Sequence, residues 1–386
     1  MSQSLIQSVV RGLVLLPVLA TAAGAVGEPQ HASASSQTPK ECYQSLALVS
    51  DQNLPGVHQD PNLVNAWGIA FNPFGFVWVA NNGTGTSTLY DGQGNPQSLV
   101  VAIPNAAGAP GGKPTGIVFN GGDGFKVSNP TASGPSRFLF ASEDGAILGW
   151  APNVDATHAL VAVNNSKQHA IYKGLALATF GTGFRLFATD FHNGRVDAFD
   201  DTFHAFTTLG GFQDPNLPSG YAPFGIQNLN GDLYVTYAKQ DEDKEDNVSG
   251  PGLGFVDVFD VNGRLLRRVA SRGTLNAPWG IALAPADFGR FSNHLLVGNF
   301  GDGVINAFDP VTGQWAGRLH RPDGQLLRMD GLWGLSFGNG LQHQPTHTLF
   351  FAAGPNDESH GLYGRIEPAA CRNDDWLKRQ FESDNE

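Results

Sequence analysis

Several carboxylates and one lysine stand in this sequence at the ends of hydrophobic runs, close to glycine turns. Glu143, Asp144 and Asp190 bring negative charge to positions where comparable segments of the chain carry neutral residues. Side-chain oxygens of this kind accept hydrogen bonds from ligands and coordinate Ca²⁺. Lys173 stands where comparable segments carry an aromatic residue, so its ammonium could pair with these carboxylates or with an anionic ligand. These four residues are the starting point for a predicted site.

Large aromatic residues stand directly before a glycine in several of the same segments, and they would give such a site apolar walls. Apolar walls with a few convergent polar groups are the usual form of a ligand site. The residues predicted to surround one ligand site are Trp67, Asn81, Asn82, Glu143, Asp144, Lys173, Asp190, Phe224, Tyr237, Trp279, Asn299 and Trp333. For a metal ion, the predicted ligands are Glu143, Asp144, Asp190 and Asn299, with Ca²⁺ as the ion that suits their oxygens. No residue can be assigned as catalytic.

Two short motifs look chemical but favour a structural interpretation. Gly334–Gly338 matches the pattern G-x-S-x-G, but a nucleophile elbow needs a strand-to-helix turn and this segment reads as a strand. His343 and His347 have the spacing of helical metal ligands, but Pro345 between them prevents a helix. We therefore assign neither motif a chemical role.

A run of charged residues, Asp241–Asp246, lies between the predicted strands Leu233–Thr236 and Phe255–Phe259. Such runs are usually solvated. We expect an inserted, mobile loop here, with a loose calcium site as the alternative.

The elements that must position these residues come from a sixfold repeat. Each copy begins with a Gly-Ile-Ala-like strand, and its glycines are Gly68, Gly116, Gly174, Gly225, Gly280 and Gly334, separated by 48, 58, 51, 55 and 54 residues. A repeat of about 50 residues with several short strands is typical of a propeller. The predicted fold is all-β, a six-bladed β-propeller with four-stranded blades. Because each second strand ends on the face where the first begins, the predicted site residues should ring one mouth of the axial channel.

The third predicted strand ends in aspartate in four copies, at Asp91, Asp200, Asp260 and Asp309. Aspartate there can accept hydrogen bonds within its own turn. We expect these four residues to be structural.

The sixth copy lacks its fourth strand. It offers strands at Leu332–Phe337, Thr348–Ala352 and Gly361–Ile366, while Gln44–Val49 near the other end of the chain has the pattern of the fourth strand Gln97–Ala102. We predict that the N-terminal strand completes the last blade and closes the ring.

The two cysteines of the chain support this closure. Cys42 precedes the N-terminal strand and Cys371 follows the last one, so antiparallel pairing of those strands would bring the thiols together. We predict a disulfide, which in the chain-entropy model stabilises the fold by about 4–5 kcal/mol because the closed loop is long.

Composition and the N-terminus indicate an exported protein. The net charge of −12, with only 23 Lys and Arg, argues against nucleic acid or an anionic membrane as partner. Residues 1–25 resemble a signal peptide, with Arg11, a short apolar stretch and Ala-x-Ala-like cleavage sites. The predicted organisation is a signal peptide at 1–25, a flexible linker at 26–41, the propeller at 42–371 and a polar tail at 372–386. The mature protein is expected to be secreted or periplasmic, without stable membrane insertion.

The clearest copy, Pro278–Ala282 followed by Leu296–Asn299 and Gly303–Asp309, resembles NHL-type repeats. Asn62–Ala70 and Val79–Gly85 are similar to segments of an uncharacterised family of exported, NHL-like six-bladed propellers, some of which carry a PEP-CTERM sorting tail. This chain ends without that tail. The resemblance implies the propeller fold and leaves the activity open, because NHL-type propellers include both scaffolds and enzymes.

Two functions from different classes remain at this point. The first is a binding or interaction protein that uses the channel mouth for a small molecule, a glycan or a peptide. The second is a Ca²⁺-dependent lactonase-like or ester hydrolase, because calcium-dependent lactonases share the six-bladed form and hold a central ion with carboxylates and amides. Here aromatic residues, Thr115 and Lys173 stand before the inner strands where such an enzyme would place an acid.

Overall fold

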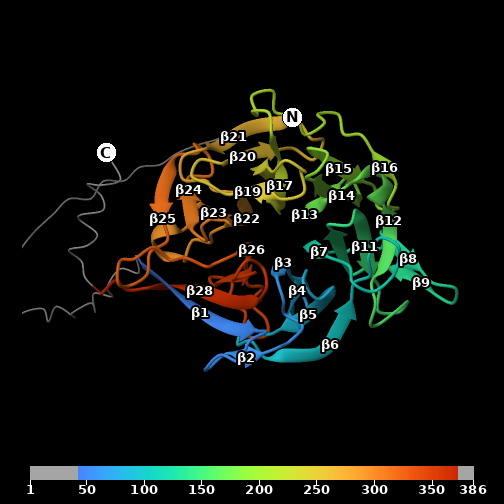
Figure 1. The fold of residues 1–386 in the computed structure, drawn as a ribbon, viewed down its shortest axis with the longest axis horizontal. Coiled ribbons are helices and arrows are strands. Elements are labelled where there is room, and N and C mark those ends of the chain that lie inside the picture. The colour runs from blue at the N-terminus through green and yellow to red at the C-terminus, as the bar shows by residue number, and fades with distance from the viewer. Residues whose placement is uncertain (1–41, 373–386) are drawn as a thin grey trace, which may run out of the picture. The chain divides into compact units, whose positions relative to one another are not determined.

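The computed structural model describes residues 42–372. These residues form six blades, each with four antiparallel main strands, around a central axis (Figure 1). The predicted signal peptide, the linker and residues 373–386 of the predicted tail lie outside the described residues. In the described part of the chain, no helix has the length and apolar character needed to span a membrane.

The six blades follow one another along the chain, each running outward from an inner strand. The first contains β3 (Ala66–Phe71), β4 (Val77–Asn81), β5 (Thr86–Tyr90) and β6 (Pro96–Ala102). The second contains β7 (Pro114–Phe119), β10 (Phe138–Ser142), β11 (Ala146–Trp150) and β12 (Leu160–Asn164), and the third β13 (Tyr172–Phe180), β14 (Gly183–Asp190), β15 (Arg195–Phe199) and β16 (Ala205–Phe206). The fourth contains β17 (Tyr221–Leu229), β18 (Asp232–Gln240), β20 (Gly254–Phe259) and β21 (Leu265–Ser271), and the fifth β22 (Pro278–Leu283), β23 (Leu295–Asn299), β24 (Ile305–Phe308) and β25 (Trp315–Arg318).

Several short strands and two 3₁₀ turns lie between the main strands of the blades. Strands β8 (Lys126–Ser128) and β9 (Ser133–Pro135) pair as a separate ribbon, and β19 (Asn247–Val248) pairs with β18. Two 3₁₀ turns, η1 (Ser166–Gln168) and η2 (Gly289–Phe291), lie in connections between strands.

The sixth blade confirms the predicted closure. It joins β26 (Leu332–Phe337), β27 (Leu349–Ala353) and β28 (Leu362–Ala369) to β1 (Cys42–Ser50), which carries β2 (His58–Gln59) on its outer edge. Strands β1 and β28 run antiparallel, with Cys42 opposite Ala369, so the blue and red ends of the ribbon meet in one sheet in Figure 1. The predicted disulfide is confirmed, since Cys42 is bonded to Cys371 across 329 residues. Such a bond is compatible with an oxidising compartment.

Hydrophobic residues fill the spaces between neighbouring blades, because successive side chains along each strand point to opposite faces of its sheet. Between the first and second blades, the indole of Trp78 stacks on Phe138 with ring centroids 4.0 Å apart. Ser336 of the G-x-S-x-G segment lies on β26, as the repeat predicted, and not on a strand-to-helix turn.

The four turn aspartates also have the predicted structural role. A carboxylate oxygen of each accepts hydrogen bonds from main-chain N–H groups two to four residues further on, as for Asp91 with Gln93 and Asn95. Burial alone would raise the pKa of Asp91, but the hydrogen bonds from Asn95 and Gln93 lower it overall.

Candidate functional site

A β-bulge at the start of every inner strand sets the positions of the central side chains. In the first blade the pairing of β3 with β4 shifts between Ala66 and Ile69, which lifts Trp67 and Gly68 out of the ladder. Equivalent shifts release Thr115, Lys173, Phe224, Trp279 and Trp333 in the other five blades. Bulges re-aim side chains in this way at the rims of closed sheets.

The repeated glycine is required because neighbouring inner strands approach closely at the bulges. A Cβ atom on Gly68 would lie 2.4 Å from the carbonyl oxygen of Thr115, and one on Gly116 would lie 2.4 Å from the main-chain nitrogen of Leu175. The glycine spacing seen in the sequence is therefore a consequence of strand contact around the axis.

Three tryptophans meet at the axis. The rings of Trp67 and Trp333 have centroids 3.8 Å apart, and Trp279 packs edge-on against both. Phe224 and Phe300 also contact Trp333. Trp67 and Trp333 are buried, while Trp279 and Phe300 remain partly exposed. These rings form an aromatic floor, which we define as Trp67, Phe224, Trp279, Phe300 and Trp333.

One amide fixes two of these indoles. The Oδ1 atom of Asn65 accepts hydrogen bonds from Nε1 of Trp67 at 2.9 Å and Nε1 of Trp333 at 3.1 Å. Asn65 has a φ of 46°, a left-handed conformation that asparagine tolerates better than most residues. Its Nδ2 atom donates to Oε1 of Glu358.

Lys173 brings a buried positive charge to this floor. Its residue is only 1% exposed, and its Nζ atom lies 5.2 Å from the ring centroid of Trp67. The ammonium donates to Oε1 of Glu143 at 2.5 Å and to Oδ1 of Asp246 at 2.9 Å. Burial alone would lower the pKa of Lys173, but the charges of Glu143 and then Asp246 raise it overall, so the lysine is cationic.

The carboxylates around Lys173 come from three separate connections. Glu143 follows β10, Asp246 belongs to the insertion in the fourth blade, and Glu358 lies between β27 and β28. Glu143 also accepts a 2.8 Å hydrogen bond from Nδ2 of Asn82. Burial, followed by the charge of Glu143, raises the pKa of Glu358. We call Glu143, Asp246 and Glu358 the acidic rim.

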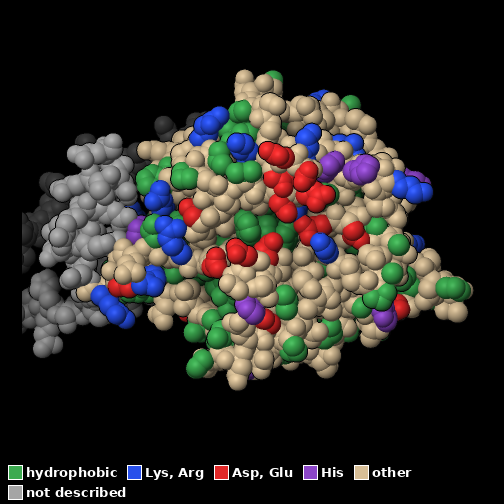
Figure 2. Space-filling view, in the orientation of Figure 1, with side chains coloured by type: hydrophobic (Ala, Val, Ile, Leu, Met, Phe, Trp, Pro, Cys, Tyr) green, Lys and Arg blue, Asp and Glu red, His purple; other side chains and the backbone are tan. Residues whose placement is uncertain are grey.

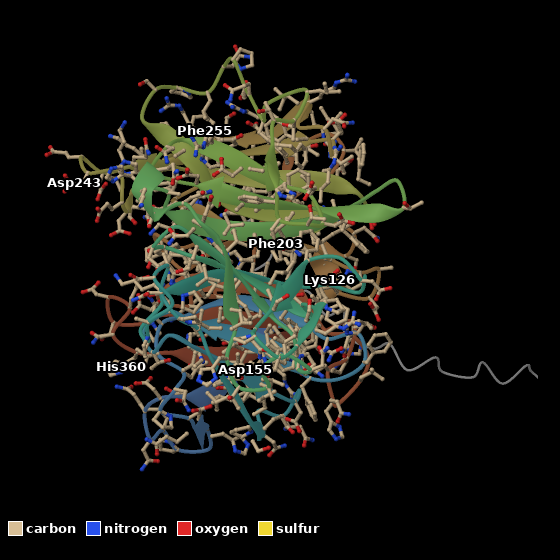
Figure 3. All side chains as sticks on the ribbon, turned by 90° about the vertical axis from the view of Figure 1, so that its right-hand side faces the viewer. Lys126, Asp155, Phe203, Asp243, Phe255 and His360 are labelled. Carbon is tan, nitrogen blue, oxygen red and sulfur yellow. A yellow bond between two sulfur atoms is a disulfide. The ribbon has the colours of Figure 1, made fainter. Side chains whose placement is uncertain are left out.

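Acidic side chains gather near the middle of one face of the molecule (Figure 2). In the side view the loops that carry Asp243 and His360 project from one side, and Lys126 lies toward the other (Figure 3). The insertion that we expected to be a mobile, solvated loop is exposed over most of its length, yet the ion pair of Asp246 ties its end to Lys173.

The structure brings seven of the twelve predicted residues together at this mouth, namely Trp67, Asn82, Glu143, Lys173, Phe224, Trp279 and Trp333. The remaining five have other surroundings.

Asn81, Asp190 and Asn299 end the second strands of their blades and hold the turns that follow. Asn81 donates to Thr86 and Thr88, and Asp190 accepts from Ile171 and Asn193. Asn299 donates to the carbonyl of Thr274 and to Asp302, and accepts from the main chain of Asn276. Burial is the main cause of the raised pKa of Asp190.

Asp144 and Tyr237 also face away from the aromatic floor. The carboxylate of Asp144 accepts hydrogen bonds from Ser142 and from the main chain of Ala106. Tyr237 packs in the hydrophobic core cluster that includes Phe187 and Phe255.

The predicted calcium ligands do not fit a metal ion. Asp144, Asp190 and Asn299 belong to three different blades, and each side chain is engaged in its own turn. No group of three or more His, Cys, Asp or Glu residues with metal-binding geometry occurs among residues 42–372. The ammonium of Lys173 already places a cation against Glu143 and Asp246.

Sequence reasoning missed five residues at the mouth: Asn65, Phe191, Asp246, Phe300 and Glu358. Phe191 packs against Phe224 of the aromatic floor, with ring centroids 5.1 Å apart. Phe191 and Phe300 directly follow Asp190 and Asn299, so an offset of one residue in the repeat alignment would have found them. Asp246 was noted only as part of a charge run, and Glu358 has no counterpart in the repeat.

The axis narrows beneath the aromatic floor. A cavity of about 20 Å³ lies among Gly68, Gly116, Leu175 and Trp279, which is room for a single water. Where the inner strands end, the axis widens into a hollow of about 680 Å³ that includes Phe71, Phe119 and Asn228.

The fold and the bulged inner strands define a six-bladed β-propeller whose axis is filled by aromatic rings at one mouth. The chain belongs to the same family as uncharacterized protein L690 of Acanthamoeba polyphaga mimivirus, to which it is 35% identical over 327 residues, 83% of this chain and 84% of that protein. Protein R648 of the same virus is 34% identical over 326 residues, which cover 83% of this chain and 78% of R648.

No family model matches the sequence. Among solved structures, a protein of unknown function from Bacteroides thetaiotaomicron superposes with a TM-score of 0.51 at 12% identity, over 84% of this chain and 76% of that one. This likeness concerns the fold alone. The expected propeller fold is thus confirmed and is consistent with a binding or interaction role, while export stays a prediction.

Proposed function

We propose that this chain is a secreted binding protein whose acidic rim and aromatic floor recognise a positively charged group, such as the lysine or arginine side chains of a peptide. The observation that carries the proposal is the buried ammonium of Lys173 held between Glu143 and Asp246 above Trp67. The two carboxylates and the indole of Trp67 thus already hold one cation, which is the ammonium of Lys173.

Charge at the mouth favours a further cation. The acidic rim contributes three carboxyl groups and Lys173 offsets only one charge. Burial is the main cause of the raised pKa of Glu358, and the negative charge of Glu143 raises it further. A second positive charge near Glu358 would relieve the repulsion. The exposed acidic side chains of the insertion would add attraction during approach.

The aromatic floor supplies matching surfaces. Trp279 and Phe300 are partly exposed, and indole and phenyl faces attract ammonium and guanidinium groups. A hydrogen bond from Nε1 of Trp279 to the carbonyl oxygen of Lys173 fixes the indole beside the buried charge. A cation at the mouth would thus contact aromatic faces and carboxylates at once.

The hydrolase hypothesis finds no comparable support. The oxygens proposed to hold a catalytic Ca²⁺ are distributed over separate turns, and the ammonium of Lys173 already pairs with Glu143. We therefore do not carry it forward.

Calorimetric titration with pentalysine, pentaglutamate and a neutral Gly-Ser peptide tests the proposal. Pentalysine should bind, pentaglutamate and the neutral peptide should not, and added salt should weaken the binding because exposed charges are screened. Asp246→Asn should weaken pentalysine binding by about three- to fivefold. The control Asp123→Asn removes the same charge from an exposed residue outside the mouth and should bind as the wild type does.

Two results would overturn the assignment. Equal binding of pentalysine to wild type, Asp246→Asn and Asp123→Asn would show that only net charge attracts the peptide. Salt-independent binding of a neutral oligosaccharide, lost in Trp279→Ala, would assign the mouth to a glycan instead.

A further inference from the structure

A second concave site lies between the first and second blades, away from the acidic rim. It has a volume of about 580 Å³, within the usual range for small-molecule sites. Its walls come from β4, β5, β10 and β11 and from the connections that follow β3 and β7, and they include the side chains of Phe76, Trp78, Leu89, Phe119, Phe138 and Trp150. Aromatic rings thus make up most of the wall.

Arg137 supplies a positive charge at the same pocket. Its Nη1 atom donates to the carbonyl oxygen of Gly122 at 3.0 Å, but its guanidinium forms no ion pair with a carboxylate in residues 42–372. Guanidinium groups bind carboxylates through two parallel hydrogen bonds. The guanidinium is a cationic donor, so the complementary ligand carries acceptors and negative charge.

The rim of the pocket exposes an aromatic side chain. Phe74 is 82% exposed and contacts Phe119 edge-on, with centroids 6.3 Å apart. A phenyl group exposed beside an apolar pocket can pack over a flat ligand bound there.

We propose that this pocket binds a small aromatic carboxylate, with its ring against Phe74, Phe76 and Phe119 and its carboxylate at Arg137. Stacked and edge-on ring contacts would hold the ring. The guanidinium of Arg137 fixes the orientation of the carboxylate. The aromatic walls and the cationic guanidinium select this class over aliphatic or cationic compounds.

Titration of the whole protein with 2-naphthoate, followed by tryptophan fluorescence, tests the proposal. The neutral analogue 2-naphthamide and the non-aromatic cyclohexanecarboxylate should each bind about tenfold more weakly or worse. Arg137→Gln should weaken 2-naphthoate binding by about tenfold.

A second variant separates binding from folding. Gly121 lines the pocket, and a Cβ there would meet only the ring of Phe119 at 3.6 Å. Gly121→Leu should therefore fill the pocket and abolish binding while the melting temperature stays unchanged.

The proposal fails if 2-naphthoate does not bind at millimolar concentration. It also fails if Arg137→Gln and Gly121→Leu, both folded, bind it as tightly as the wild type. Self-association that Phe74→Ser abolishes, without binding of 2-naphthoate, would assign the pocket to a second copy of the chain.

Discussion

The Nζ atom of Lys173 lies 2.5 Å from Oε1 of Glu143, and this pair joins the second and third blades at the axis. Lysine is rarely buried without a partner, because a lone ammonium loses its hydration in the interior. The pair therefore has two roles. It allows the lysine side chain to be buried at the mouth, and it sets the charge of the proposed binding surface.

Removing the carboxylate of this pair should destabilise the fold. Glu143→Gln leaves the buried ammonium with Asp246 alone, and we expect the free energy of unfolding to fall by about 1–3 kcal/mol, less than for a fully isolated charge. Denaturant titration measures this loss. Asp323→Asn, which breaks the exposed pair with Arg321, should leave stability unchanged. Equal stability of Glu143→Gln and wild type would mean that the pair is not formed.

The pH dependence of the free energy of unfolding should reflect the titration of the Glu358 carboxyl group. Its folded-state pKa is raised, so its contribution to stability is fully present below the unfolded pKa of about 4.3 and is lost as pH rises through the folded pKa. Glu358 accepts hydrogen bonds from Nδ2 of Asn65 and Nε1 of Trp67, and Glu358→Gln keeps an acceptor oxygen for both but carries no charge. At pH 7 it should melt on the order of 1–2 °C above the wild type, and the gain should vanish near pH 4. A lower melting temperature at pH 7 would contradict the inferred repulsion.

The indole donor of Trp333 should depend on the acceptor that it shares with Trp67, Oδ1 of Asn65. Asn65→Gly removes Oδ1 without strain at a φ of 46° and should cost about 1–3 kcal/mol, since Trp333 loses its partner. Asn65→Ala should cost about 1 kcal/mol more because its Cβ is strained at positive φ. Asn230→Gly is the matched control, an exposed asparagine with a φ of 57°. A cost no larger than that of the control would refute the role of Asn65.

The disulfide should stabilise the closed ring. Replacing Cys42 and Cys371 by serine frees a loop spanning 329 residues and should lower the free energy of unfolding by about 3–5 kcal/mol. Reduced wild type should unfold at the same denaturant concentration as the double variant. If oxidised and reduced wild type unfold together, the pairing of β1 with β28 alone holds the ring.

Strand contact at the axis should make the repeated glycines intolerant of substitution. Gly68→Ala would place a Cβ 2.4 Å from the carbonyl oxygen of Thr115 and should cost about 1–3 kcal/mol. Gly75→Ala, where the nearest atom is 3.8 Å away, should have little effect. Similar melting temperatures for the two variants would contradict the close packing.

The repeat made the fold predictable, because six copies of one pattern each impose the same strands and the same glycine. It also exposed the broken copy, and with it the strand β1 and the disulfide of Cys42 with Cys371. The site was harder to predict, because the repeat gives chain positions and not side-chain directions. Glu143 and Asp144 are adjacent in sequence, yet one pairs with Lys173 and the other binds the main chain of Ala106.

Contacts that break the repeat could not be predicted at all. Asp246 reaches Lys173 from an insertion 73 residues away, and Glu358 reaches Asn65 across 293 residues. Neither residue has a counterpart in the other blades, so only the folded chain brings them to the mouth.

The indole N–H signals of the seven tryptophans offer the most direct test of the proposed binding mouth. In a ¹⁵N–¹H spectrum titrated with pentalysine, the account predicts that the Trp279 signal, assigned by Trp279→Phe, shifts with peptide concentration. The signals of Trp78 and Trp150, in the pocket between the first two blades, should stay in place. An unmoved Trp279 signal at saturating pentalysine would contradict the claim that the aromatic floor and acidic rim bind cations.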